Sequence, residues 1–166
     1  MKTLGIWIFA MMAAGAVSAA DYSDYVTLAE TSSARMDQTH AGNIDAAIQE
    51  QTRLLALGRA NAEAFGRDFP EYAEMMAFVS ESGPKMTTMT LEAIEAAWHE
   101  GSALEDAGFL NTTIDHFGVL NSIVDMVVHP ATAIIALRQY KASGDQAFLE
   151  QVKDEMAEVV EHIHQL

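Results

Sequence analysis

The fold is decided by residues 112–141, which read TTIDHFGVLNSIVDMVVHPATAIIALRQYK. This is the most apolar stretch of the chain, and its apolar residues cover most of the circumference of a helix. Such a pattern is typical of a helix that other helices enclose. Pro130 lies inside the stretch, and an internal proline removes one backbone hydrogen bond and kinks or breaks a helix. The stretch therefore predicts either a kinked central helix or two helices that meet near His129.

Amphipathic patterns on both sides of this stretch predict further helices. The clearest apolar stripes belong to a long helix from Asn43 to about Arg67 and to a last helix over 145–165. Shorter helices are predicted over 23–33, over 70–81, where Ser82-Gly83-Pro84 would end the helix, and from Thr88 or Thr90 onwards. Strand signals are sparse. We therefore predict an all-α chain, an antiparallel up-and-down helical bundle of four main helices plus short ones.

Residues 1–20 have the pattern of a secretory signal peptide that is cleaved. Lys2 supplies the positive charge, a short apolar run follows, and the small residues Val17-Ser18-Ala19-Ala20 offer a cleavage site. The apolar run is too short to span a membrane. The expected organisation is thus a signal peptide over 1–20, an N-terminal segment over 21–42 that could form a short helix, and a helical-bundle domain over 43–166. This predicts a periplasmic protein with no stable membrane insertion after cleavage.

Composition excludes several classes of function. The 166 residues contain 24 acidic and 9 basic side chains, a net charge of −15, and no cysteine. The missing cysteine excludes disulfides, thiol catalysis and covalent haem attachment, and the negative charge argues against nucleic acid as a partner. The chain also lacks a Gly-x-Ser-x-Gly elbow, a phosphate-binding glycine loop and a His-Glu-x-x-His motif. An enzyme is disfavoured, and we expect a protein that binds a small ligand or another exported protein.

Two histidines on apolar faces are candidate cofactor ligands. His116 falls in the middle of the apolar face of the central stretch, where a buried imidazole needs a partner. It is predicted to be either a hydrogen-bonded core residue or a ligand to haem iron or another metal. His162 falls at the edge of the last apolar stripe, with Glu155 and Glu158 in reach. Met36 together with His162 would match the haem ligation of four-helix b-type cytochromes, by analogy of architecture only.

Glu92, Glu95 and His99 are predicted to share one flank of their helix. Spacings of three and four residues place their side chains together on a helix surface. Carboxylate and imidazole groups of this kind bind zinc or iron, but the same pattern also fits a solvated helix face. Both interpretations stay open at this point.

His129 is predicted to lie opposite the apolar face of the central stretch, four residues after Asp125. The simpler interpretation is a surface ion pair beside the kink. The alternative is a polar pocket opened by Pro130, because a proline leaves a carbonyl free about one turn earlier, near Met126.

Two further patterns suggest metals. Met86 and Met89 are predicted to lie in a polar loop, where two thioethers three residues apart could chelate Cu(I), or else to pack at the entry of a helix. Glu161 and His164 have the spacing of carboxylate-bridged di-iron bundles, but they project away from the apolar stripe, so a di-iron centre is disfavoured. The sequence thus leaves copper, iron and haem open as cofactors.

Overall fold

The computed structural model describes residues 22–109 and 118–164, and every regular element in these two ranges is helical. The elements are α1 (Ser23–Arg35), η1 (Met36–Gln38), α2 (Ile44–Asp68), η2 (Pro70–Tyr72), α3 (Ala73–Met86), α4 (Leu91–Ile94), a π-helical turn η3 (Glu95–His99), α5 (Ser102–Asp106), α6 (Val119–Ser143) and α7 (Ala147–Ile163). The all-α prediction is confirmed. The predicted signal peptide and His116 lie outside the described residues.

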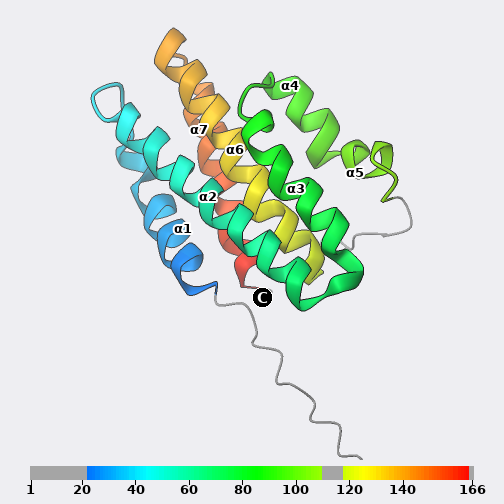
Figure 1. Ribbon diagram of the computed structural model, residues 1–166. Helices are drawn as coiled ribbons and strands as arrows, with labels where there is room; N and C mark the ends of the chain where they lie inside the picture. Colours follow the sequence, from blue (N-terminus) through cyan, green and yellow to red (C-terminus); the bar gives the residue numbers. More distant parts are fainter. Residues whose placement is uncertain (1–21, 110–117, 165–166) are drawn as a thin grey trace, which may run out of the picture.

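Helix α6 forms the centre of the core. It packs against α2, α3 and α7, and buried side chains lie all around it from Ser122 to Leu137. By length and composition α6 could cross a membrane, yet 78% of its most apolar window is buried inside the protein. That burial is what the core helix of a folded domain shows. Figure 1 shows α1 on one side of the molecule and α4 and α5 on the opposite side.

One continuous helix runs through Pro130, so the alternative of two separate helices is wrong. A proline cannot donate a hydrogen bond to the carbonyl four residues earlier, here that of Met126. The hydroxyl of Tyr25 on α1 donates to this carbonyl at 3.1 Å instead. A side chain distant in sequence thus replaces the missing backbone donor and lets the helix continue.

The prediction that Ser82-Gly83-Pro84 ends a helix over 70–81 is wrong, because a distant side chain again replaces the backbone donor that a proline lacks. Helix α3 continues through Pro84 to Met86. The carbonyl that Pro84 leaves free is that of Ser80, and the Nε of Arg59 on α2 donates to it at 2.6 Å.

Helices α2 and α6 run in opposite directions at close range. Gly58 faces Met126, and Lys141 near the end of α6 pairs with Asp45 near the start of α2 at 2.6 Å. A Cβ atom on Gly58 would lie 2.0 Å from the carbonyl oxygen of Met126, so only glycine permits this approach. The contact holds the middle of α6 close against α2.

Candidate functional site

Seven titratable side chains gather where η3, α6 and α7 meet, and we call them the polar cluster. Its members are Glu95, His99, Asp125, His129, Glu155, Glu158 and His162. Each of the three elements contributes a carboxylate four residues before a histidine: Glu95 and His99 on η3, Asp125 and His129 on α6, Glu158 and His162 on α7. The repeated spacing places carboxylate and imidazole side by side on each helix face. Three helix faces carrying the same pair therefore converge on one site.

His129 is the centre of the polar cluster. It is only 2% exposed, and its Nδ1 lies 2.7 Å from Oε2 of Glu155. A carboxylate accepts hydrogen bonds and cannot donate, so Nδ1 is the protonated nitrogen of this pair. The other nitrogen, Nε2, faces Asp125 Oδ1 at 3.9 Å and Glu158 Oε2 at 3.6 Å. These two distances are too long for hydrogen bonds.

The prediction of a surface ion pair for His129 is therefore wrong. The pairing with Asp125 exists, but α7 packs over this side of α6 and buries it. The alternative pocket is also not as expected, because the Met126 carbonyl that Pro130 frees accepts a hydrogen bond from the Tyr25 hydroxyl.

Electrostatics favour a positive charge at the cluster. Burial alone would lower the pKa of His129, but the hydrogen bond that His129 donates to Glu155 and the charges of Asp125, Glu155 and Glu158 outweigh burial and raise that pKa above its ordinary value of 6.5. Burial, and then the charge of Asp125, raise the pKa of Tyr25 well above 10.0. For a tyrosine a raised pKa favours the neutral form, whereas for His129 it favours the charged form. The hydroxyl of Tyr25 therefore keeps its proton and remains a donor.

His162 and Asp125 form a second buried contact. The Nδ1 of His162 lies 2.6 Å from Oδ2 of Asp125, and the histidine is 4% exposed. The rings of His129 and His162 are 5.7 Å apart between centroids. Asp125 thus faces both histidines, one with each carboxylate oxygen.

His99 is held differently from the other two histidines. Its Nε2 lies 3.0 Å from Oγ1 of Thr132, whose hydroxyl already donates to the carbonyl of Val128. Nε2 of His99 is therefore the donor toward Thr132. The same nitrogen is 3.8 Å from Glu155, so His99 supports the cluster from its η3 side.

Three combinations of these residues bring their ligand atoms within 4.8 Å of one another: Asp125 with His129 and His162, His99 with His129 and Glu158, and Glu95 with His99 and Glu155. His129 belongs to two of them. Around a tetrahedral ion with bonds of about 2.0–2.2 Å, neighbouring ligand atoms lie about 3.3–3.6 Å apart. The separations at Nε2 of His129 are close to that range.

The structure brings some predicted site residues together and separates others. Glu95, His99 and His162 all join the polar cluster. Glu92 is exposed and belongs to none of the three combinations. Met36 is buried in the core beside the first turns of α7, where its neighbour Asp37 pairs with Lys153. Lys153 precedes His162 by nine residues, about 13 Å along a helix, so Met36 and His162 are not brought together.

Met86 belongs to the end of α3 and not to the predicted loop, whereas Met89 does lie in the turn before α4. Met86 is 1% exposed at the end of α3, and Met89 packs partly buried against the core. These thioethers fill space in the hydrophobic interior, as methionines commonly do. Glu161 and His164 are exposed, in agreement with their projecting away from the apolar stripe.

Sequence reasoning missed the joint role of Asp125, His129, Glu155 and Glu158. The signal that could have found it is the carboxylate-x-x-x-histidine spacing, which occurs on three separate helical segments. Comparison with protein-family models, with curated proteins and with solved structures gives no match for this chain. The chemistry of the polar cluster is therefore the guide to function.

Proposed function

We propose that the chain is an exported, acidic helical-bundle protein that binds a divalent first-row transition-metal ion, with His129 as the central ligand. The proposal retains the predicted signal peptide, periplasmic location and antiparallel four-helix arrangement as expectations. The sequence predicted a non-enzymatic binding protein without identifying its ligand, and we propose that this ligand is a metal ion.

One observation carries the proposal: the buried Nε2 of His129 faces two carboxylates at 3.6 and 3.9 Å while Nδ1 is bonded to Glu155. Metal-ligating histidines typically donate their second ring nitrogen to a carboxylate, which fixes the tautomer and raises the basicity of the ligand. Glu155 occupies that position. In the neutral imidazole, the tautomer that Glu155 selects has the lone pair of Nε2 facing Asp125 and Glu158, and a metal ion bound there would take the place of the proton that the raised pKa of His129 favours.

The proposed ligand set is His129, His162, Asp125 and Glu158, which takes its members from the two combinations that contain His129. Glu158 shares no combination with His162 or Asp125, so its side chain must move toward them for all four to bind one ion. His162 and Asp125 are 2.6 Å apart, so an ion that binds both must displace a proton and separate the two atoms by somewhat under 1 Å, given the spacing of ligands around a tetrahedral ion. The side chain of Glu158 is 53% exposed, which gives the ion a path from solvent. Two imidazoles and two carboxylates suit Zn(II), Fe(II) or Cu(II), whereas Cu(I) prefers sulfur ligands. The carboxylates around both histidines also favour a bare ion over haem.

The test is a calorimetric titration of the purified metal-free chain with Zn²⁺ at pH 7.5. We expect about one equivalent to bind, with loss of binding in His129→Gln and a drop of about 10–100-fold in affinity in Glu155→Gln, the range for removal of such a supporting carboxylate. Glu158→Gln guards against misfolding of the His129 variant, because this side chain is half exposed and its loss should weaken binding without unfolding the chain.

The matched control is His164→Gln. This histidine follows α7, its side chain is 63% exposed, and it belongs to none of the three combinations. It should bind Zn²⁺ as the unmodified chain does. Binding that is absent in the unmodified chain, or that is lost equally in His164→Gln, would overturn the proposal and leave the polar cluster as a buried ion-pair network.

A further inference from the structure

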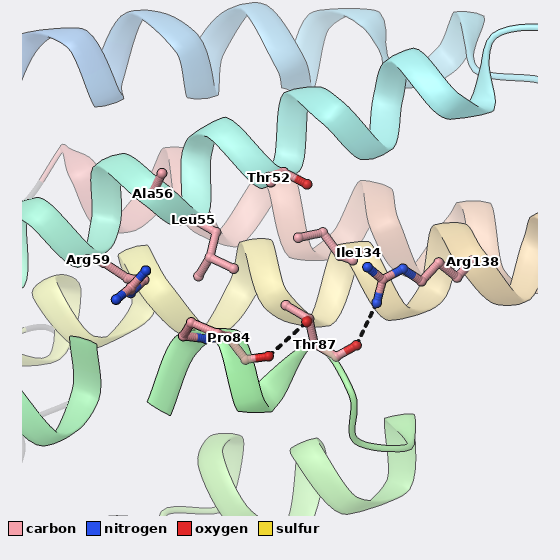
Figure 2. Close-up of a pocket in the computed structure, with 8 residues that line it drawn as sticks. All are labelled: Thr52, Leu55, Ala56, Arg59, Pro84, Thr87, Ile134 and Arg138. Atoms are coloured by element: carbon pink, nitrogen blue, oxygen red, sulfur yellow. Dashed lines mark hydrogen bonds between the residues drawn. The ribbon is translucent and has the colours of Figure 1, made fainter. Parts of the chain in front are cut away.

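A second site lies on a different face of α6. A cavity of about 230 Å³ opens between α2, α3 and α6, beside the proline of α3 (Figure 2). Its eight lining residues are Thr52, Leu55, Ala56, Arg59, Pro84, Thr87, Ile134 and Arg138. Ile134 lines the cavity, whereas Thr132, two residues earlier on α6, contacts His99 of the polar cluster. Two residues of a helix that are two positions apart point about 200° apart around its axis. The cavity and the polar cluster are thus separate features of α6.

The charge of this cavity is opposite to that of the chain. The sequence has 24 acidic side chains against 9 basic ones, yet the cavity is lined by two arginines and by no aspartate or glutamate. Among the described residues, no carboxylate lies within ion-pair distance of Arg59 or Arg138. Two guanidinium groups without a protein counter-ion offer hydrogen-bond donors that match a carboxylate.

Both arginines are held at the cavity by backbone carbonyls. Nε of Arg59 donates to Ser80, the carbonyl that Pro84 frees, and Nη1 of Arg138 donates to Thr87 at 2.7 Å. Figure 2 shows the two guanidinium groups at opposite ends of the lining, with Leu55, Pro84 and Ile134 between them. The arrangement is an apolar floor with a cation at each end.

We infer that this cavity binds an aliphatic carboxylate, whose hydrocarbon chain covers the apolar floor and whose carboxylate pairs with a guanidinium group. Binding sites for small molecules are commonly apolar with a few placed polar groups, and they usually measure about 300–1,000 Å³. The smaller volume here limits the ligand to a short chain. The acidic surface elsewhere repels anions, so the ligand is recognised by this local reversal of charge.

The test uses octanoate as the probe, with calorimetry or ligand-observed NMR as the readout. Octanoate should bind, while octylammonium, with the same chain and opposite charge, and acetate, with the charge but no chain, should bind at least about tenfold more weakly. Arg138→Gln should lower the affinity for octanoate by at least about fivefold, on the scale of a charge-assisted hydrogen bond. Arg59→Lys should do the same while keeping a donor near Ser80.

Arg53→Gln is the matched control, because it removes one positive charge from an exposed position outside the cavity on α2, the helix that also carries Arg59. It should leave octanoate binding unchanged. No octanoate binding, equal binding of octylammonium, or an equal loss in Arg53→Gln would overturn the inference. Zn²⁺ binding is expected to be unchanged in Arg138→Gln, so the result does not depend on the proposed metal site.

Discussion

Replacing Tyr25 by phenylalanine tests how α6 tolerates a proline in its middle. The ring of Tyr25 is 1% exposed, and its hydroxyl donates to the Met126 carbonyl at 3.1 Å. Phenylalanine keeps the ring and opens no cavity, so the change isolates the hydrogen bond. It leaves a buried carbonyl that Pro130 cannot serve, which should lower the free energy of unfolding by about 1–3 kcal/mol.

The decisive comparison repeats this change in a Pro130→Ala background. Alanine restores a backbone N–H that can donate to Met126, so the carbonyl keeps a partner when the tyrosine hydroxyl is removed. Tyr25→Phe should then cost about 1 kcal/mol less than in the unmodified chain. Urea unfolding of the four proteins of this double-mutant cycle, monitored by circular dichroism, gives the coupling energy.

Tyr140→Phe is the matched control. This tyrosine is also buried, but its hydroxyl only accepts a long contact of 3.4 Å from Gln146. Tyr140→Phe should lower the free energy of unfolding by less than Tyr25→Phe does. Equal costs of Tyr25→Phe with and without Pro130 would refute the conclusion that the tyrosine hydroxyl replaces the missing backbone donor.

Three further predictions concern packing and the polar cluster. Gly58→Ala should lower the free energy of unfolding by about 1–3 kcal/mol despite the better helix propensity of alanine, because the new Cβ meets the Met126 carbonyl at 2.0 Å; an increase in urea midpoint would contradict this. Met76→Ala, at a fully buried site, should cost about 2–5 kcal/mol in the same assay, and a cost under 1 kcal/mol would show that the site collapses. Because the pKa of His129 is raised in the folded state, its contribution to stability is present below pH 6.5 and is lost as the pH rises through the raised pKa. Unfolding at several pH values should show this loss in the metal-free chain and less of it in Glu155→Gln, and identical profiles would count against the assignment.

The long-range parts of the fold explain where sequence reasoning succeeded and where it failed. The apolar face of α2 was predicted from periodicity, and Ile44, Leu54 and Phe65 on that face are buried. Apolar periodicity is a local property, so it predicts the buried face of a helix without knowledge of the rest of the chain. The predicted end of the helix over 70–81 was wrong because the Ser80 carbonyl accepts a hydrogen bond from Arg59, a residue 21 positions away. A local reading of Ser-Gly-Pro cannot include such a partner.

The polar cluster was predictable only in pieces. The pairs Glu95 with His99 and Asp125 with His129 are visible as spacings, but their convergence depends on the packing of α7 against α6 and on the contact of His99 with Thr132 of α6. The π-helical turn at Glu95–His99 has no sequence signal that separates it from an α-helix, although such turns are frequent at functional sites. The prediction that His129 lies on the surface was wrong. Polar neighbours on one side of a helix normally mean that this side faces solvent, but here that side of α6 packs against a polar face of α7.

The most direct test of the proposed function is the position of a bound ion. Crystals of the chain grown or soaked with Zn²⁺ would give an anomalous difference map at the zinc absorption edge. We predict a peak about 2.0–2.1 Å from Nε2 of His129, the ordinary length of a zinc–imidazole bond, with His162, Asp125 and Glu158 as the other ligands and Nδ1 still donating to Glu155. A peak only on exposed side chains, or an unchanged Asp125–His162 contact at 2.6 Å with no peak beside His129, would contradict the proposal.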